Sequence, residues 1–144
     1  MIKTAASLDN FKFISSIPGA GQLNSALLLG FAGDISRFDN YKQLNAFLGL
    51  DLNRYQSGKY LKNDTINRRG SSQGRVVETD MIRSILRNQG RIQNHLINYY
   101  YKLKKPPFNK HDKVALIACA NHLNRTIINL VHTHQFYNYS KAIH

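Results

Sequence analysis

Ser57 is a candidate nucleophile, and it stands in the segment Tyr55-Gln56-Ser57-Gly58-Lys59. The cations close to it in the sequence are Arg54, Lys59, Arg68 and Arg69. A serine hydroxyl attacks a phosphodiester when a base takes its proton or when cations stabilise the developing charge. Ser-Gly pairs are also common in turns, so the spacing alone favours an ordinary turn over catalysis. The basic turn Ile66–Gly70 also has two interpretations: it is either a phosphate clamp or a solvated loop.

A second candidate is the turn Pro18-Gly19-Ala20-Gly21, which separates two helical patterns. Small residues in such a turn allow a DNA strand to approach the backbone, and the N–H groups that open the next helix attract a phosphate. The pattern is typical of a helix-hairpin-helix, so we predict DNA contacts at Gly19, Ala20, Gly21 and Gln22. The alternative is an ordinary αα-hairpin whose glycines only form the bend.

Other residue types give weaker signals. The six histidines are scattered, and His132 and His134 do not share a helical face, so we expect no metal site in this chain. Tyr99-Tyr100-Tyr101 could stack on bases, but we expect Tyr100 to belong to the core. Cys119 is the only cysteine and is expected to be a buried apolar residue, which excludes an internal disulfide.

The charge of the chain is strongly positive. Its 144 residues include 20 Lys and Arg against 8 Asp and Glu, for a formal net charge of +12, and Glu78 is the only glutamate. A polyanion is the natural partner of such a chain, because each neutralised phosphate releases condensed counterions. A solvated basic surface is the alternative. We find no run of about 20 apolar residues and no signal peptide, so we expect a cytoplasmic protein with no membrane role.

These residues are expected on an all-α single domain that spans 1–144. Helical periodicity predicts helices at Leu8–Ile17 and Gln22–Ala32, the second apolar nearly all round and therefore buried. The helix-hairpin-helix would cover about 8–33. Asn40 and Gln43 resemble a capping box for a third helix that ends at Gly49. A basic irregular loop with room for a short hairpin follows at about 51–75.

The C-terminal part, about 76–133, is expected to form a helical bundle. Its first two helices would start near Val77 and Ile92, and the last would run from Val114 to about His132 with Asp112 as its N-cap.

Several segments, taken in order, resemble the C-terminal transposase domain of the IS110/IS116/IS902 insertion-sequence family. The resemblance extends from about Phe13 to Tyr137. It rests mainly on Ser16–Gly21, Gly33–Phe38, Tyr55–Lys59, Ile66–Gly70 and Lys113–Ala118. The chain departs from the family at Asn121-His122, where Arg-Lys is usual. The resemblance covers nearly the whole chain.

The resemblance implies that Ser57 is the nucleophile of DNA strand exchange and becomes joined to a DNA phosphate. It also implies that a separate N-terminal RuvC-like domain supplies an acidic, Mg²⁺-binding centre, and that some members use a guide RNA. We therefore expect no cofactor in this chain, and Mg²⁺ only with that other domain. We expect the chain to be truncated, inactive alone, and located at the bacterial nucleoid. Its expected partners are element-end DNA, a guide RNA, the RuvC-like domain and a second copy of itself.

Two alternatives belong to other functional classes. A non-catalytic helix-hairpin-helix protein would bind DNA or structured RNA through the same turn and loop. A basic structural protein of a ribonucleoprotein would prefer folded RNA to duplex DNA.

Overall fold

The computed structural model describes residues 10–50 and 72–142 of the chain. Within them the structure is helical and contains no strand, apart from one isolated bridge between Gln89 and Ile92. The all-α prediction is therefore confirmed. The elements are α2 (Phe11–Ser15), α3 (Gln22–Ala32), the 3-10 helix η1 (Ile35–Arg37), α4 (Tyr41–Phe47), α7 (Ser72–Arg87), α8 (His95–Lys104), α9 (Asp112–Thr133) and α10 (Tyr139–Ala142).

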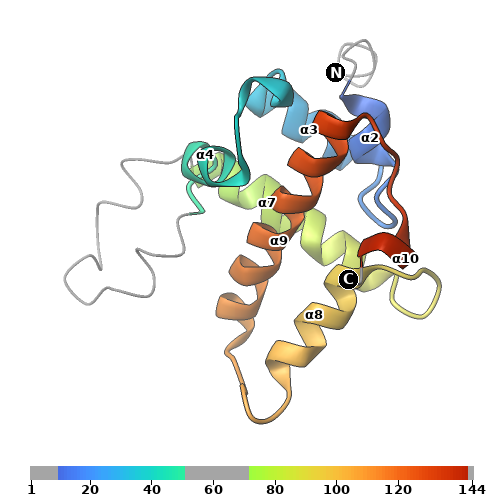
Figure 1. The fold of residues 1–144 in the computed structure, drawn as a ribbon. Coiled ribbons are helices and arrows are strands. Elements are labelled where there is room, and N and C mark those ends of the chain that lie inside the picture. The colour runs from blue at the N-terminus through green and yellow to red at the C-terminus, as the bar shows by residue number, and fades with distance from the viewer. Residues whose placement is uncertain (1–9, 51–71, 143–144) are drawn as a thin grey trace.

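Helix α9 is the centre of the fold, because it packs against α8, α7, α4, α2 and η1 (Figure 1). Its sequence explains this position: buried apolar residues recur along it from Ala115 to Val131. By length and composition alone α9 could also cross a membrane, with a mean hydropathy of 1.2 over 18 residues. In the fold, 61% of that window is buried against other helices, as expected of a core helix.

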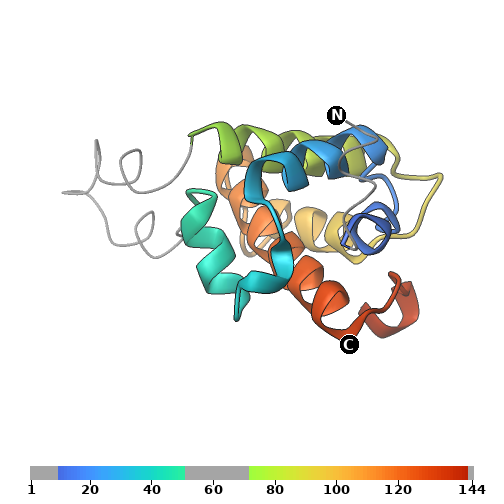
Figure 2. The same ribbon diagram turned by 90° about the horizontal axis from the view of Figure 1, so that it is seen from above.

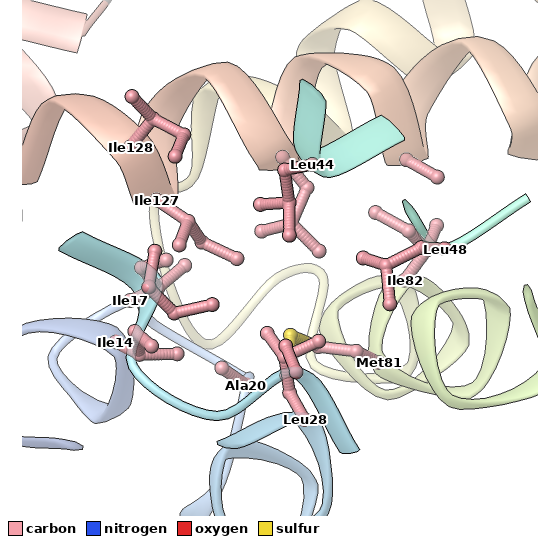
Figure 3. Close-up of a cluster of buried hydrophobic side chains, with 14 of the residues drawn as sticks. Ile14, Ile17, Ala20, Leu28, Leu44, Leu48, Met81, Ile82, Ile127 and Ile128 are labelled. Carbon is pink, nitrogen blue, oxygen red and sulfur yellow. The ribbon is translucent and has the colours of Figure 1, made fainter. Parts of the chain in front are cut away.

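The hydrophobic core is assembled from helices far apart in the sequence (Figure 3). Ile14, Leu28 and Leu44 are fully buried there, beside Met81 and Ile127. Full burial of an aliphatic side chain of this size stabilises a protein by about 1.5–3 kcal/mol. The N-terminal hairpin and the C-terminal helices therefore share one core.

Helix α3 occupies the residues that its pattern predicts, Gln22–Ala32, but it is not buried all round. Its buried side carries Ser25, Ala26, Leu28, Leu29 and Ala32. Leu23 is 56% exposed, which corrects the expectation of a fully buried helix. Leu23 lies in the first turn of α3, where Gly21 and Gln22 are exposed as well.

The sequence predicts the start of one helix correctly and the starts of two others incorrectly. Asn40 caps α4 as expected, since its side chain accepts a hydrogen bond from the Gln43 backbone N–H at 3.1 Å. Asp112 is the first residue of α9 rather than its cap, so that prediction is wrong. Helix α8 begins at His95, three residues later than Ile92, because the Asn94 side chain accepts from the Leu96 N–H at 2.9 Å.

The expected loop at 51–75 is too long, because α7 already begins at Ser72. Gly74 lies inside the helix, where a Cβ would come within 3.1 Å of the Leu48 Cα. The glycine therefore allows α7 to pack directly against the end of α4. Tyr100 is half-buried rather than a core residue, whereas Cys119 is fully buried as predicted.

Candidate nucleic-acid interface

The turn between α2 and α3 is fixed against the C-terminal half of α7, which runs beside α3 (Figure 2). Gly19 has φ +87°, and a Cβ on it would lie 2.8 Å from the Ile85 Cα. Two side chains hold the turn: Ser84 Oγ donates to the Gly19 carbonyl at 2.8 Å, and Asn94 Nδ2 donates to the Pro18 carbonyl at 2.8 Å. The close approach that Gly19 allows is thus used by α7.

The four turn residues predicted to contact DNA divide into two pairs. Ala20 is fully buried, and Gly19 packs against α7. Gly21 and Gln22 are exposed, and nothing lies within 4 Å of a Cβ built on Gly21. No side chain caps α3 at Gly21. The surface available to a ligand is therefore the first turn of α3, from Gly21 onward.

Ser57, Arg54, Lys59, Arg68 and Arg69 lie outside the residues that the structure describes. The described residues that flank this segment are in contact with each other. Gly74 packs on Leu48, and Arg75 Nη1 donates to the Gly49 carbonyl at 3.4 Å. The chain therefore leaves α4 and enters α7 at neighbouring points.

One side of α7 carries three arginines at helical spacing, with Thr79 between the first two of them. Arg83 and Arg87 are exposed, and Thr79 and Arg75 continue the same line toward the start of the helix. We call these four residues the α7 basic stripe. Neighbours in the stripe are about 6 Å apart along the helix axis. This arrangement suits an extended row of phosphates, and the guanidinium groups can bind phosphate through two hydrogen bonds.

The stripe borders a groove with α8 and α9, which consists of two neighbouring hollows. One hollow of about 360 Å³ lies between Arg83, Arg87 and the rings of Tyr100 and Tyr101. A second, of about 270 Å³, lies between the stripe and Lys113 of α9. Both hollows include Arg83 and Leu116, so they are neighbours. The groove therefore places exposed cations beside half-buried aromatic rings.

Two carboxylates lie in or beside this groove. Asp80 is 3.9 Å from the Arg83 guanidinium, in an exposed pair that contributes little to stability. The Tyr100 hydroxyl donates to Asp112, and this hydrogen bond raises the pKa of Tyr100 to about 12. Asp112 also lies in the first turn of α9, where the helix dipole favours a negative charge. The tyrosine therefore stays protonated across the physiological range and joins α8 to α9.

The hairpin turn and the basic stripe occupy different sides of α7. Ser84 and Ile85 face the turn, whereas Arg83 and Arg87 face the groove with α8 and α9. Gly74, at the start of the helix, marks where the Ser57 segment returns. That point is about 16 Å along the helix axis from Ile85. The described residues thus spread the candidate contacts along α7 instead of gathering them at one point.

Comparison with known proteins identifies the family to which the chain belongs. The sequence profile described as Transposase IS116/IS110/IS902 family matches residues 12–98, which include the hairpin, Ser57 and α7. The chain belongs to this transposase family. It is also 33% identical over 84 residues to the transposase for insertion sequence element IS1111A of Coxiella burnetii. That match covers 58% of this chain and 23% of the relative. No solved structure matches.

This member of the IS110 transposase family offers no fit for a Mg²⁺ centre in its described part. No group of three or more His, Cys, Asp or Glu lies close enough there to hold a metal ion. His132 is used otherwise, since its Nε2 contacts the Phe38 carbonyl at 2.9 Å.

Sequence reasoning missed two features of this transposase domain. Glu78 is fully buried, and neither of its oxygens has a hydrogen-bond partner in the described structure. Burial raises the pKa of Glu78 to about 8. A cavity near the C-terminus gathers His95, His122 and Arg125. No spacing signal could have found the cavity, because its residues come from three separate segments.

Proposed function

We propose that this chain is the DNA-binding C-terminal part of an IS110-family transposase and acts in DNA transposition. The observation that carries the proposal is the family match over residues 12–98, which spans both the α7 basic stripe and Ser57. The exposed arginines of the stripe and the groove beside them support contacts with the phosphate backbone. The first turn of α3, from Gly21 to Gln22, adds backbone N–H donors for a further phosphate.

In this proposal Ser57 is the nucleophile of strand exchange. Its Oγ attacks a backbone phosphorus, the bond to one sugar oxygen breaks, and the serine becomes esterified to the phosphate. The serine proton leaves, and the departing sugar oxygen takes up a proton, so the step is balanced. Arg54, Lys59, Arg68 and Arg69 would stabilise the charge on the phosphoryl oxygens.

The matched stretch covers 23% of the Coxiella transposase. We propose that a RuvC-like acidic domain acts with this chain, and that DNA at the element ends is its substrate. A guide RNA and a second copy of the chain are further proposed partners. The place of action is then the bacterial chromosome in the cytoplasm.

The DNA-binding proposal is tested with duplex carrying the element end. Arg83→Gln combined with Arg87→Gln should weaken binding about tenfold or more. It should also lower the slope of log K against log salt by about 0.9 for each lost phosphate contact. The matched control is Lys12→Gln with Lys42→Gln, which removes the same charge from the exposed sides of α2 and α4. Equal effects of both pairs would leave only a diffuse charge effect and contradict an interface on α7.

The catalytic proposal is tested separately, by looking for a covalent protein–DNA adduct. Supercoiled element-end DNA is incubated with the chain and an added RuvC-like domain of the family, then analysed under denaturing conditions. The adduct should form with the wild-type chain and disappear with Ser57→Ala, while Ser71→Ala retains it. If no adduct forms although duplex binding persists, the chain is a non-catalytic nucleic-acid-binding protein. Tighter binding to folded RNA than to duplex would instead favour a ribonucleoprotein component.

A further inference from the structure

The segment after α9 folds back over the second half of that helix and encloses a cavity. In Figure 1 the dark-red chain passes α2 and then turns toward α8. The cavity has a volume of about 350 Å³ and lies between His122, Arg125 and Thr126 of α9 and the residues from Gln135 to Lys141. Pockets for small ligands begin at about this size.

Tyr137 fixes the lid of this cavity. Its backbone N–H donates to Ser16 Oγ at 2.9 Å, and its hydroxyl oxygen accepts from the His95 backbone N–H at 3.0 Å. The same hydroxyl lies 2.8 Å from His95 Nδ1. The two rings stack, with centroids 5.7 Å apart. The Tyr137 hydroxyl also donates to Asn94 Oδ1 at 3.4 Å, so hydrogen bonds tie the lid both to Ser16 and to the start of α8.

The charge of the cavity is positive. Arg125 and Lys141 border it, and no Asp or Glu belongs to its lining in the described structure. Burial lowers the pKa of His95 to about 4, with a smaller effect from His122, and burial also lowers the pKa of His122. Both imidazoles are thus neutral at pH 7, and the two cations supply the charge. The His122 ring also contacts the Tyr99 ring, with centroids 4.0 Å apart.

The other lining groups are suited to a flat, polar ligand. Asn129, Gln135 and Asn138 supply amide donors and acceptors at the rim. Phe136 packs on Phe13 with centroids 5.4 Å apart, yet its side chain is 58% exposed. Aromatic rings, side-chain amides and a pair of cations are the groups by which proteins bind a base together with its phosphate.

We propose that this cavity binds one nucleotide, with the phosphate at Arg125 and Lys141 and the base among Phe136, His122 and the rim amides. The nucleotide is either a free mononucleotide or an unpaired residue of a single strand. The site is separate from the α7 groove, because none of its lining residues belongs to the lining that contains Arg83 and Leu116. The inference does not depend on transposase activity or on Ser57.

The test is a titration of the full chain with three probes: dAMP, a short single-stranded oligodeoxyadenylate, and inorganic phosphate. Binding is followed by calorimetry and by the NMR signals of the His95 and His122 rings. We expect saturable binding of dAMP, or of the oligonucleotide at lower concentration, and much weaker binding of phosphate. Arg125→Gln with Lys141→Gln should weaken it about tenfold or more, where tenfold corresponds to about 1.4 kcal/mol.

Two controls make the result specific. Lys102→Gln with Lys110→Gln removes the same charge from outside the cavity and should leave dAMP binding unchanged. Arg83→Gln with Arg87→Gln should weaken duplex binding and also leave dAMP binding unchanged, which separates this proposal from the proposed function. Oligonucleotide binding without dAMP binding identifies a strand as the source. The proposal is overturned if neither nucleotide probe binds, if phosphate competes equally, or if the cavity variant, shown to be folded by circular dichroism, binds like the wild type.

Discussion

The two faces of α7 belong to one continuous helix, yet one face exposes its ionisable side chains and the other buries one. The outer face exposes Arg83 and Arg87 to solvent beside the groove. The inner face packs Gly74 on Leu48 and Ile85 on Gly19, and it buries Glu78 completely. A guanidinium in water keeps its charge at little cost, whereas a carboxylate without partners in the core is more stable when protonated.

This difference changes the charge of the whole molecule. The formal value of +12 counts Glu78 as negative. With a pKa of about 8, the buried Glu78 is mostly neutral at pH 7, so the folded chain is more positive than its composition states. Changes on the inner face should therefore alter folding and leave DNA binding intact, and changes on the outer face should do the reverse.

The largest change in the free energy of unfolding is expected from a substitution in the turn between α2 and α3, which packs on the inner face of α7. Gly19→Ala places a Cβ 2.8 Å from the Ile85 Cα at a positive φ, and should reduce the free energy of unfolding by about 3 kcal/mol. Gly21→Ala is the matched control: it has φ +79° but open space, and should cost about 1 kcal/mol. Urea unfolding measures both. Equal losses would show that the turn does not pack on α7.

The next effect is the pH dependence that Glu78 introduces. Because its pKa rises from 4.5 to about 8 on folding, the folded chain holds a proton that the unfolded chain releases. Its contribution to the free energy of unfolding is complete below pH 4.5. Above pH 4.5 the contribution falls by about 1.4 kcal/mol per pH unit, and it is lost as the pH rises through 8. Glu78→Gln should remove this loss, a difference of about 2 kcal/mol between pH 6.5 and pH 8.

Unfolding curves of both proteins across that range provide the measurement. His95 acts in the opposite sense, because its pKa falls from 6.5 to about 4 and its contribution is lost as the pH falls from 6.5. His95 is the same in both proteins, so the difference between their pH profiles isolates Glu78. Parallel pH profiles for the wild type and Glu78→Gln would contradict a buried, neutral glutamic acid.

The smallest effect is expected on the outer face. The variant that combines Arg83→Gln with Arg87→Gln should change the free energy of unfolding by less than about 0.5 kcal/mol, because its one described ion pair, with Asp80 at 3.9 Å, is exposed. The same variant is expected to lose duplex affinity. A large loss of stability would show that the stripe is structural, and the comparison between the two faces would fail.

Local sequence patterns predict secondary structure correctly where the interactions that fix it lie within one segment. The bounds of α3 and the Asn40 cap follow from residues within a few positions of each other. The start of α7 could not be predicted, because Ser72 and Gly74 are poor helix formers by propensity. Packing of Gly74 against Leu48 outweighs that propensity.

The candidate site shows the same division. The sequence singled out the Pro18–Gly21 turn, and the structure shows that Gly19 and Ala20 serve the core whereas Gly21 and Gln22 face solvent. Arg83 and Arg87 are four residues apart, and this spacing puts them on one side of a helix. It could not show that Tyr100, Tyr101 and Lys113 complete a groove there, because those residues come from other helices.

The sequence by itself determined the helical class, the positive charge and the family, because periodicity, composition and ordered motifs are properties of the chain as written. Only the tertiary structure decided which small residues are buried, which acid loses its charge, and which separate segments enclose the cavity at Arg125. The physical reason is that burial and neighbours set the free energy of each group, and both come from contacts between residues distant in the chain.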